Sequence, residues 1–271
     1  MAIQVNGTQV IGNSRELTNI ASIDSTTKSA IEAAGIGGGS IAWDPTSTPD
    51  VTLTSSGTWT KPGSLASTTW IFVYMVGGGG SGRSDQTWTN GGGGGGAHIF
   101  SGLASEFPSS IAFTVGAGGV PNNNGTATSC TISGLLYEAQ GGSHNASSGT
   151  GRGGNGTSAV NYGGSDPFVA YPPREESNEN ADNYIAGGTS RWNNAGYSSV
   201  FGAGAGGSAY SAPIQAPGTS TYAGNGGASV QTGNAPNGGY PGGGGGGTRD
   251  ESSSAGNGGN GNVRIWYIEA T

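Results

Sequence analysis

The chain has 271 residues and a formal net charge of −7; 58 residues are glycine and only 9% are charged. Ordinary proteins contain roughly 7% glycine and about 25% charged residues. This inventory excludes a conventional aliphatic core of the expected size, although the length allows one large domain or a small one beside a larger one. The acidic balance argues against a nucleic-acid partner, since such binding depends on Lys and Arg that neutralise phosphates, and it disfavours docking on anionic lipid.

Two explanations of the glycine content fail on the sequence itself. Disordered chains avoid aromatic residues, whereas this chain holds six Trp, ten Tyr and six Phe. A collagen triple helix needs glycine at every third position, and the glycine runs 91–96 and 242–247 break that period. We therefore expect an ordered fold that is not collagen.

Targeting and redox signals are sparse. The first residues lack the charged and apolar regions of a secretory signal, and the longest apolar run, 70–76, is far shorter than a membrane span. Cys130 is alone, so no intrachain disulfide is expected, and a buried apolar role is predicted for it.

Residues 1–39 differ from the rest of the chain. Alternating residues flank Asn6-Gly7 over 3–11, a strong hairpin signal. Apolar residues at a spacing of three then lead into a short predicted helix over 24–34, closed by Gly35. A hairpin and a short helix are not stable alone in water. The segment is therefore expected to trimerise with copies of itself, to dock on another protein, or to pack on its own C-terminal domain.

Residues 40–52 are predicted to be a linker, and 53–271 a β domain. The run 70–76 is apolar on both faces, as in a strand buried on both sides. Residues 111–115 alternate as in a strand with one buried face, and 131–137 predict a weaker single strand. A terminal strand over 263–268 is expected to pair with 70–76 and close the domain.

The glycine blocks between these strands lack side chains to bury. They are predicted to form extended three-fold helices of the polyproline II kind, packed side by side at backbone distance and joined by interhelix N–H···O bonds. Because ordering glycine costs much entropy, isolated blocks would not order, but many packed blocks locked by flanking sheets would. The predicted fold class is mainly β, with irregular glycine-rich structure carrying packed polyglycine II-type helices and variable loops.

Three stretches carry a family resemblance. Gly57-Thr-Trp-Thr-Lys-Pro-Gly63 followed by 70–80 resembles the entry of the glycine-rich domain of phage tail fibres, and 258–268 is similar to its closing strand. Residues 3–20 look like a short segment recurrent in phage fibre proteins. The glycine blocks are more loosely similar to the tip adhesins of T-even-type long tail fibres, but residues 1–39 depart from those adhesins. The resemblance implies a receptor-binding virion protein, made in the host cytoplasm without a signal peptide and located at a tail fibre or tail tip.

The sequence shows no catalytic constellation. His98 lies in a predicted strand and is expected to be structural, and His144 has no nucleophile-elbow context. The charged stretch 174–182 could supply paired carboxylates for glycoside hydrolysis or oxygen ligands for calcium, although a solvated loop is expected there. We expect no enzyme activity, no cofactor and no metal.

The stretches between glycine blocks combine aromatic residues with Asn, Ser and Thr, a composition typical of loop-built recognition surfaces. The predicted receptor-binding residues are Trp88, Phe168, Tyr171, Tyr184, Trp192, Tyr197 and Tyr222. Other aromatics, including Phe201, Tyr210 and Tyr240, are expected to fold back over the glycine scaffold.

The sequence therefore predicts a homotrimeric phage adhesin that binds a cell-surface glycan or outer-membrane protein and contacts other tail proteins through residues 1–39, without nucleic-acid binding or membrane insertion. Two alternatives remain open. The protein could be a purely structural virion component, such as a fibre connector, a baseplate protein or a capsid decoration. It could also be a depolymerase that cuts surface polysaccharide.

Overall fold

The computed structural model describes residues 3–5, 8–11, 43–84, 89–144, 150–151, 153–154, 169–170, 185–191, 195–208 and 214–269. The chain divides into two compact units, Met1–Ala42 with Thr271, and Trp43–Ala270. In the first unit β1 (Ile3–Val5) pairs antiparallel with β2 (Thr8–Ile11), which confirms the predicted hairpin. The helix expected over 24–34 lies outside the described residues.

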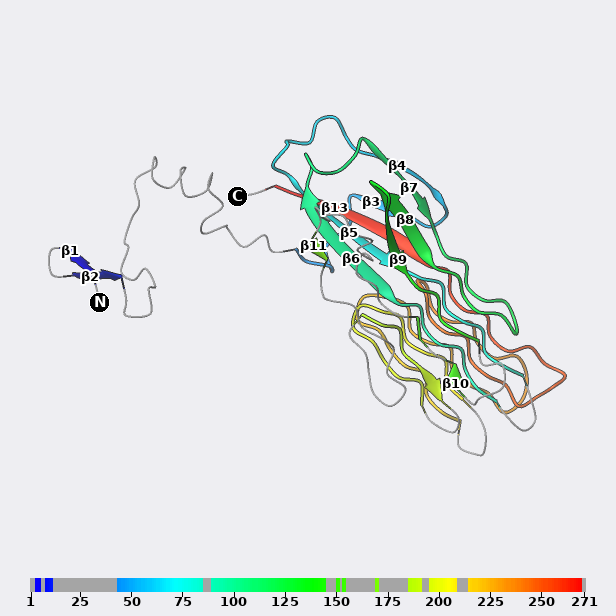
Figure 1. Ribbon diagram of the computed structural model, residues 1–271. Coiled ribbons are helices and arrows are strands. Elements are labelled where there is room, and N and C mark those ends of the chain that lie inside the picture. The colour runs from blue at the N-terminus through cyan, green and yellow to red at the C-terminus, as the bar shows by residue number, and fades with distance from the viewer. Residues whose placement is uncertain are drawn as a thin grey trace. The chain divides into compact units, whose positions relative to one another are not determined.

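The second unit is built on two antiparallel sheets (Figure 1). One has the strand order β11-β6-β5-β13-β3, and the other has the order β4-β7-β8-β9. The strands of the first are β3 (Val51–Leu53), β5 (Trp70–Val76), β6 (Ala97–Leu103), β11 (Val169–Ala170) and β13 (Asn262–Ile268). Those of the second are β4 (Gly57–Thr60), β7 (Ser110–Thr114), β8 (Thr128–Ile132) and β9 (Leu135–Ala139). A separate short ladder joins β10 (Thr150–Gly151) to β12 (Ser190–Arg191).

The described residues contain no helix, so the predicted mainly-β class is confirmed in that part of the chain. It follows that no described helix is long and apolar enough to cross a membrane.

The strands predicted from apolar patterning are largely confirmed. β5 and β13 pair over their full length, with Val73 opposite Ile265. In β7 the buried and exposed residues alternate, as predicted. The prediction of a single strand over 131–137 is wrong, because the chain reverses there between β8 and β9. Ser133 and Gly134 have φ of 52° and 82°, and positive φ at both central residues is the geometry of a tight type I′ hairpin turn.

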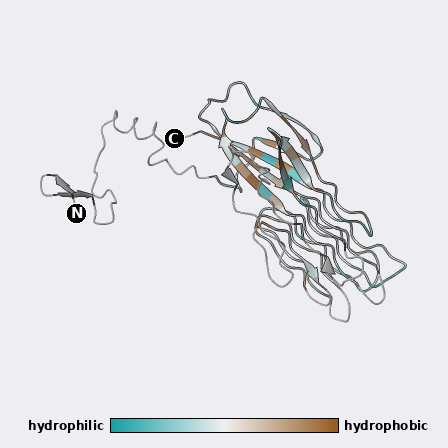
Figure 2. Cartoon of the chain, viewed as in Figure 1, coloured by the Kyte–Doolittle hydropathy of each residue, from teal (hydrophilic) through white to brown (hydrophobic). Residues whose placement is uncertain are grey.

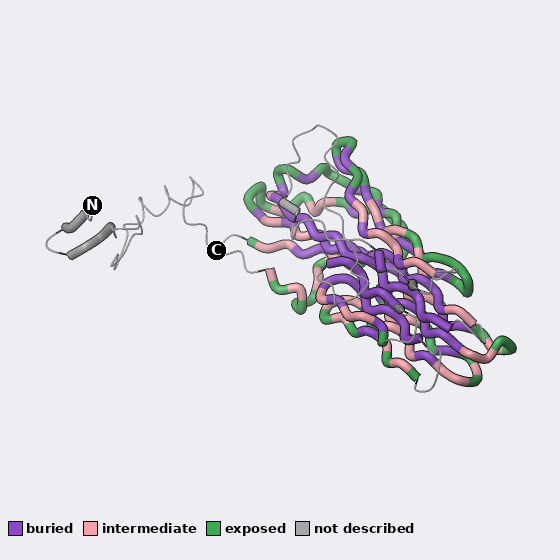
Figure 3. The backbone as a smooth tube through the Cα atoms, turned by 60° about the horizontal axis from the view of Figure 1, so that its bottom comes forward, coloured by how far each residue is buried: buried purple, intermediate pink, exposed green. Residues whose placement is uncertain are grey.

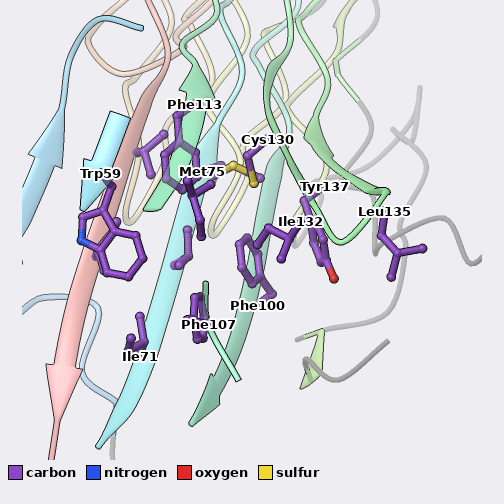
Figure 4. Close-up of a cluster of buried hydrophobic side chains, with 14 of the residues drawn as sticks. Trp59, Ile71, Met75, Phe100, Phe107, Phe113, Cys130, Ile132, Leu135 and Tyr137 are labelled. Carbon is purple, nitrogen blue, oxygen red and sulfur yellow. The ribbon is translucent and has the colours of Figure 1, made fainter. Parts of the chain in front are cut away.

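The hydrophobic core lies between the two sheets, where Figure 4 shows side chains from both converging. One face of β5 contributes Ile71, Val73 and Met75, and the second sheet contributes residues such as Phe113 and Tyr137. Cys130 is buried in this core, as predicted, and burial raises the pKa of its thiol to about 12. The free thiol is therefore protonated at neutral pH and packs as an apolar group.

His98 of β6 confirms its predicted structural role. It is 1% exposed, and its ring packs against those of Phe100 and Tyr137. Burial lowers its pKa to about 3, so the imidazole is neutral and packs as an aromatic ring. Its Nε2 has no hydrogen-bond partner.

The opposite face of β5 is covered by a column of stacked aromatic rings. Trp43 stacks on Phe72 at a centroid distance of 5.4 Å and on Phe201 at 6.1 Å. Phe201 stacks in turn on Tyr222 at 4.7 Å. Because β5 carries apolar side chains into both clusters, the predicted burial of this strand on both faces is confirmed. Trp43 packs against this cluster, and Trp266 and Tyr267 of β13 donate to Ser47 O and Asp50 Oδ2, so residues 43–50, expected to belong to a linker, contact this sheet.

The strands run directly into the glycine-rich segments, which extend side by side away from the sheets (Figure 1). Hydrophobic residues concentrate on the strands (Figure 2), yet burial continues from the strands through the glycine segments (Figure 3). The pairing of β5 with β6 passes into this region without interruption, since Gly77 N–H donates to Gly96 O at 2.9 Å. We call these packed extended segments the glycine layer.

Hydrogen bonds in the glycine layer follow a repeat of three residues, shown clearly by segment 90–96. The N–H groups of residues 92–94 donate in turn to three different segments: 242–247, 140–143 and 185–188. The next three N–H groups return to the same segments in the same order, all at 2.8–3.0 Å. The carbonyl groups of segment 90–96 accept from three further segments: 77–83, 153–154 and 203–206. The N–H and C=O groups of residues 92–96 are therefore all bonded to other segments without the help of side chains.

Neighbouring segments approach so closely that there is no room for a side chain. A Cβ added to Gly94 would lie 2.0 Å from Ala203 O, and one added to Gly244 would lie 2.1 Å from Gly92 O. Both neighbours are backbone atoms that cannot rotate away. By contrast, a Cβ on the exposed Gly63 meets nothing within 4 Å.

We predict that Gly94→Ala or Gly244→Ala destabilises the protein by about 1–3 kcal/mol or more, because the added methyl overpacks a rigid site. Gly63→Ala is the matched control and should leave the melting temperature unchanged or slightly raised, since it only restricts the unfolded chain. Thermal unfolding of the three variants measures the difference. Equal melting temperatures for all three would mean that the glycine layer is a loose solvated structure.

Candidate recognition surface

The segments of the glycine layer run between two ends. At the sheet end the chain turns at 200–202, 221–223 and 240–241, near β5 and β13. We call the opposite end the far end. Its described turns are 120–124, 231–234 and 249–254. The segments at the far end are joined by isolated β-bridges from Thr248 to Ser84 and to Val230. Ser81 also forms hydrogen bonds with both Asn123 and His144.

Buried hydroxyl side chains lie where the glycine segments reach the far end. Ser229 Oγ donates to Ser208 O at 2.9 Å or to Gln215 O at 3.0 Å, and Ser81 Oγ donates to Asn123 O at 3.1 Å. Thr89 Oγ1 makes a longer bond, 3.4 Å, to Thr248 O. These bonds join neighbouring segments to one another. They therefore form a fixed base under the far-end turns.

Asn90 belongs to this base and stands out because it is fully buried, while neither polar atom of its amide has a hydrogen-bond partner. An unpaired buried amide costs about 1–3 kcal/mol.

Two of the described far-end turns are held together by one carboxylate. Asp250 accepts hydrogen bonds from the backbone N–H and side-chain hydroxyl of Ser252, from the Ser253 hydroxyl at 2.8 Å, and from Gly233 N–H at 3.0 Å. The bonds from Ser252, Gly233 and Ser253 hold the pKa of Asp250 well below its ordinary value of 3.8. Turn 249–254 is thereby attached to turn 231–234.

Apolar side chains are also exposed at this end. Val120 is 57% exposed, and Ile214 is 51% exposed. Val120 stands beside Asn122, whose φ of 67° bends the turn sharply. Single exposed apolar residues are common on protein surfaces, but these two stand at the ends of rigid segments. They could offer contact area to a partner at little cost in ordering.

His144 lies at the same end and is half-buried. Its Nδ1 is 3.3 Å from Ser81 Oγ, and its backbone N–H donates to Asn124 Oδ1 at 2.6 Å. Burial lowers the pKa of His144, and the charge of nearby Arg83 lowers it further, against the opposing effect of hydrogen bonds from the ring to the backbone of Ser81 and Gly82. The ring is therefore neutral at physiological pH and fastens one segment to its neighbour.

The structure places few of the residues predicted to bind a receptor. Outside the described residues lie Trp88, Phe168, Tyr171, Tyr184 and Trp192. Tyr197 is half-buried on a glycine-layer segment, with its N–H bonded to Thr189 O at 3.0 Å. Tyr222 is half-buried at the sheet end, in the aromatic column. The described geometry therefore does not bring Tyr197 and Tyr222 together, and the receptor contacts of all seven residues stay predictions.

Of the aromatics expected to fold back over the scaffold, Phe201 is confirmed, being 6% exposed within the aromatic column. The same prediction is wrong for Tyr240, because this side chain is 51% exposed. It precedes Pro241 in a turn at the sheet end and does not belong to the cluster that buries Phe201. Tyr210 lies outside the described residues.

Sequence reasoning missed the role of Asp250, although a signal was present. Asp followed two and three residues later by Ser is typical of a turn held by local side-chain bonds. Val120 and Ile214 were missed because a single apolar residue in a loop carries no pattern. The charged stretch 174–182 lies outside the described residues, and the described part of the chain contains no group of three His, Cys, Asp or Glu that could hold a metal ion.

We predict that Asp250→Asn lowers the melting temperature at neutral pH, because an amide cannot accept all of these bonds. Since the pKa of Asp250 is depressed in the folded state, its stabilisation is present above the ordinary value of 3.8 and is lost as the pH falls toward the folded value. The difference from the parent protein should therefore shrink below pH 3.8. Glu269→Gln, at an exposed site near the end of the chain, is the control. A difference that stayed constant with pH would contradict this account.

Comparison with known proteins gives one result. A glycine-rich domain family model matches residues 50–268, which span both sheets and the whole glycine layer. No curated protein matches the chain. Because the match covers well over half of the 271 residues, the chain belongs to the glycine-rich domain family.

Proposed function

We propose that this protein is a bacteriophage tail-fibre or tail-tip adhesin that recognises a receptor on the host cell surface. The observation that carries the proposal is the far end of the glycine layer. Several turns emerge there from rigid segments over a base of buried hydroxyl groups. Rigid presentation favours binding, because loops that are already ordered lose less entropy when a partner docks.

The scaffold in this proposal is a bundle of packed polyglycine II-type helices. Its support is the three-residue repeat of hydrogen bonds in segment 90–96, since a polyproline II-type helix has three residues per turn. The same repeat occurs in segment 242–247, where the N–H groups of Gly244 and Gly247 donate to Gly204 and Gly207. Such a bundle carries no side chains that could discriminate between receptors, so specificity falls to the turns.

The resemblance of the entry and closing stretches to phage tail-fibre domains supports the location in a virion. In this proposal the receptor is a glycan or an outer-membrane protein, and residues 1–39 join the adhesin to other tail proteins. Two alternatives are distinguished by direct measurement. A purely structural virion protein would not label intact cells, and a depolymerase would release reducing sugars from host polysaccharide.

We predict that Trp88→Ala or Trp192→Ala weakens binding to host cells at least about tenfold without lowering the melting temperature, because loop aromatics are common hot spots of an interface. Tyr240→Ala is the matched control, since Tyr240 is an exposed aromatic at the sheet end. Binding of labelled protein to intact cells gives the affinities. The prediction fails if both tryptophan variants bind as the parent does while changes in residues 1–39 abolish binding.

We also predict that the full-length protein is a homotrimer. Residues 1–39 carry Leu17, Ile20, Ile23 and Ile31, which a hairpin and a short helix cannot bury alone. Light scattering of the purified protein should give three times the mass of 26.5 kDa. A mass of one chain, with no partner present, would instead support docking of a single copy on a fibre tip.

A further inference from the structure

Asparagine followed by glycine recurs along the margins of the glycine layer. Four such pairs in the described chain share a geometry: Asn124-Gly125, Asn225-Gly226, Asn237-Gly238 and Asn260-Gly261. All four asparagines are exposed to solvent. Each nevertheless accepts a backbone N–H from a neighbouring segment through its side-chain oxygen.

In each pair both groups bond to the same neighbouring segment. Asn225 Oδ1 accepts from Ser220 N–H at 2.8 Å, while Gly226 N–H donates to Gly218 O at 2.9 Å. Asn260 Oδ1 accepts from Gly118 N–H at 2.8 Å, while Gly261 N–H donates to Gly116 O at 2.8 Å. In both, the two partners lie two residues apart. We call this arrangement an Asn-Gly bracket.

The other two pairs make equivalent brackets. Asn124 Oδ1 accepts from His144 N–H at 2.6 Å, and Gly125 N–H donates to Gly142 O at 2.9 Å. Asn237-Gly238 bonds to a single residue. Asn237 Oδ1 accepts from Asn257 N–H, and Gly238 N–H donates to Asn257 O, both at 2.8 Å. At the margin of the layer, the asparagine amide thus takes the place of a missing backbone neighbour.

The brackets bear on the chemistry of Asn-Gly sequences. In flexible chains the backbone nitrogen of the glycine loses its proton and attacks Cγ of the asparagine side chain. A C–N bond forms, ammonia leaves, and the resulting succinimide is hydrolysed by water to aspartate or isoaspartate. Attack requires a free glycine N–H and a side chain that can swing toward it. In a bracket the N–H is held by a carbonyl, and the side chain is held by a second N–H.

We propose that the Asn-Gly brackets protect these exposed asparagines from succinimide formation and so keep the margin of the glycine layer chemically intact. Isoaspartate would be damaging there, because it adds a carbon to the backbone. The added atom would shift the residues after it out of the three-residue repeat. Exposure of all four side chains means that burial does not provide the protection.

The test compares deamidation in the folded protein with that in the same protein unfolded in urea, at mildly alkaline pH. Peptide mapping by mass spectrometry follows aspartate and isoaspartate at each of the four sites. Because two hydrogen bonds must break before attack, we expect rates at least about tenfold lower in the folded protein. Equal rates in the two states at these sites would overturn the proposal.

A variant separates the brackets from folding in general. Ser133→Asn places an asparagine before Gly134 in the exposed turn between β8 and β9. Asn-Gly is the preferred sequence of such a turn, and Ser133 already has a φ of 52°, so the fold should be preserved. The new pair has no bracket and should deamidate within about threefold of the unfolded rate, while the four bracketed sites stay slow. If the new pair were as slow as the bracketed ones, rigidity alone would explain the protection and the proposal would fail.

Discussion

The structure depends on backbone hydrogen bonding between segments that carry no side chains. A buried peptide group must find partners, and the glycine layer supplies them by surrounding each inner segment with others. The approach distances leave no room for a Cβ at positions such as Gly94. Ordering glycine costs more entropy than ordering any other residue, so one segment cannot order by itself. The two sheets reduce this cost, because their paired strands continue into glycine segments that are already aligned, as β5 and β6 do at Gly77 and Gly96.

The margins of the glycine layer explain the rest of the composition. A segment without a neighbour on one side has peptide groups with no backbone partner there. Asn, Ser and Thr side chains accept those N–H groups, as Asn237 does from Asn257 and Thr126 does from Ala117. Uncharged polar residues suit this role, because they accept a bond while adding no charge beside closely packed carbonyls. The low charge content and the frequent Asn-Gly pairs are consequences of the same packing.

The sequence predicted the strands better than it predicted their surroundings. β5 and β13 carry enough apolar residues to be identified, and their pairing follows from the need to close the domain. The sequence did not predict the β8–β9 hairpin, because a serine such as Ser133 does not indicate a positive φ as an asparagine would. The sequence could not predict which glycine segments bond to one another, since one glycine block is chemically identical to another. The placement of Tyr222 was equally hidden, because its stacking on Phe201 depends on two turns separate in sequence.

The two ends of the glycine layer are held by different interactions, and this difference bears on where new binding properties could arise. At the sheet end, Phe201 is fixed by stacking on Trp43, Tyr222 is fixed by stacking on Phe201, and Arg264 donates to Tyr222 O. Changes in those turns would disturb the packing of the sheet. The far-end turns begin beyond the last interlocked segments, and the described ones depend on local bonds such as those of Asp250. A far-end turn could therefore change in length or sequence while the hydrogen bonds between segments stayed in place, so a single scaffold could present many different surfaces.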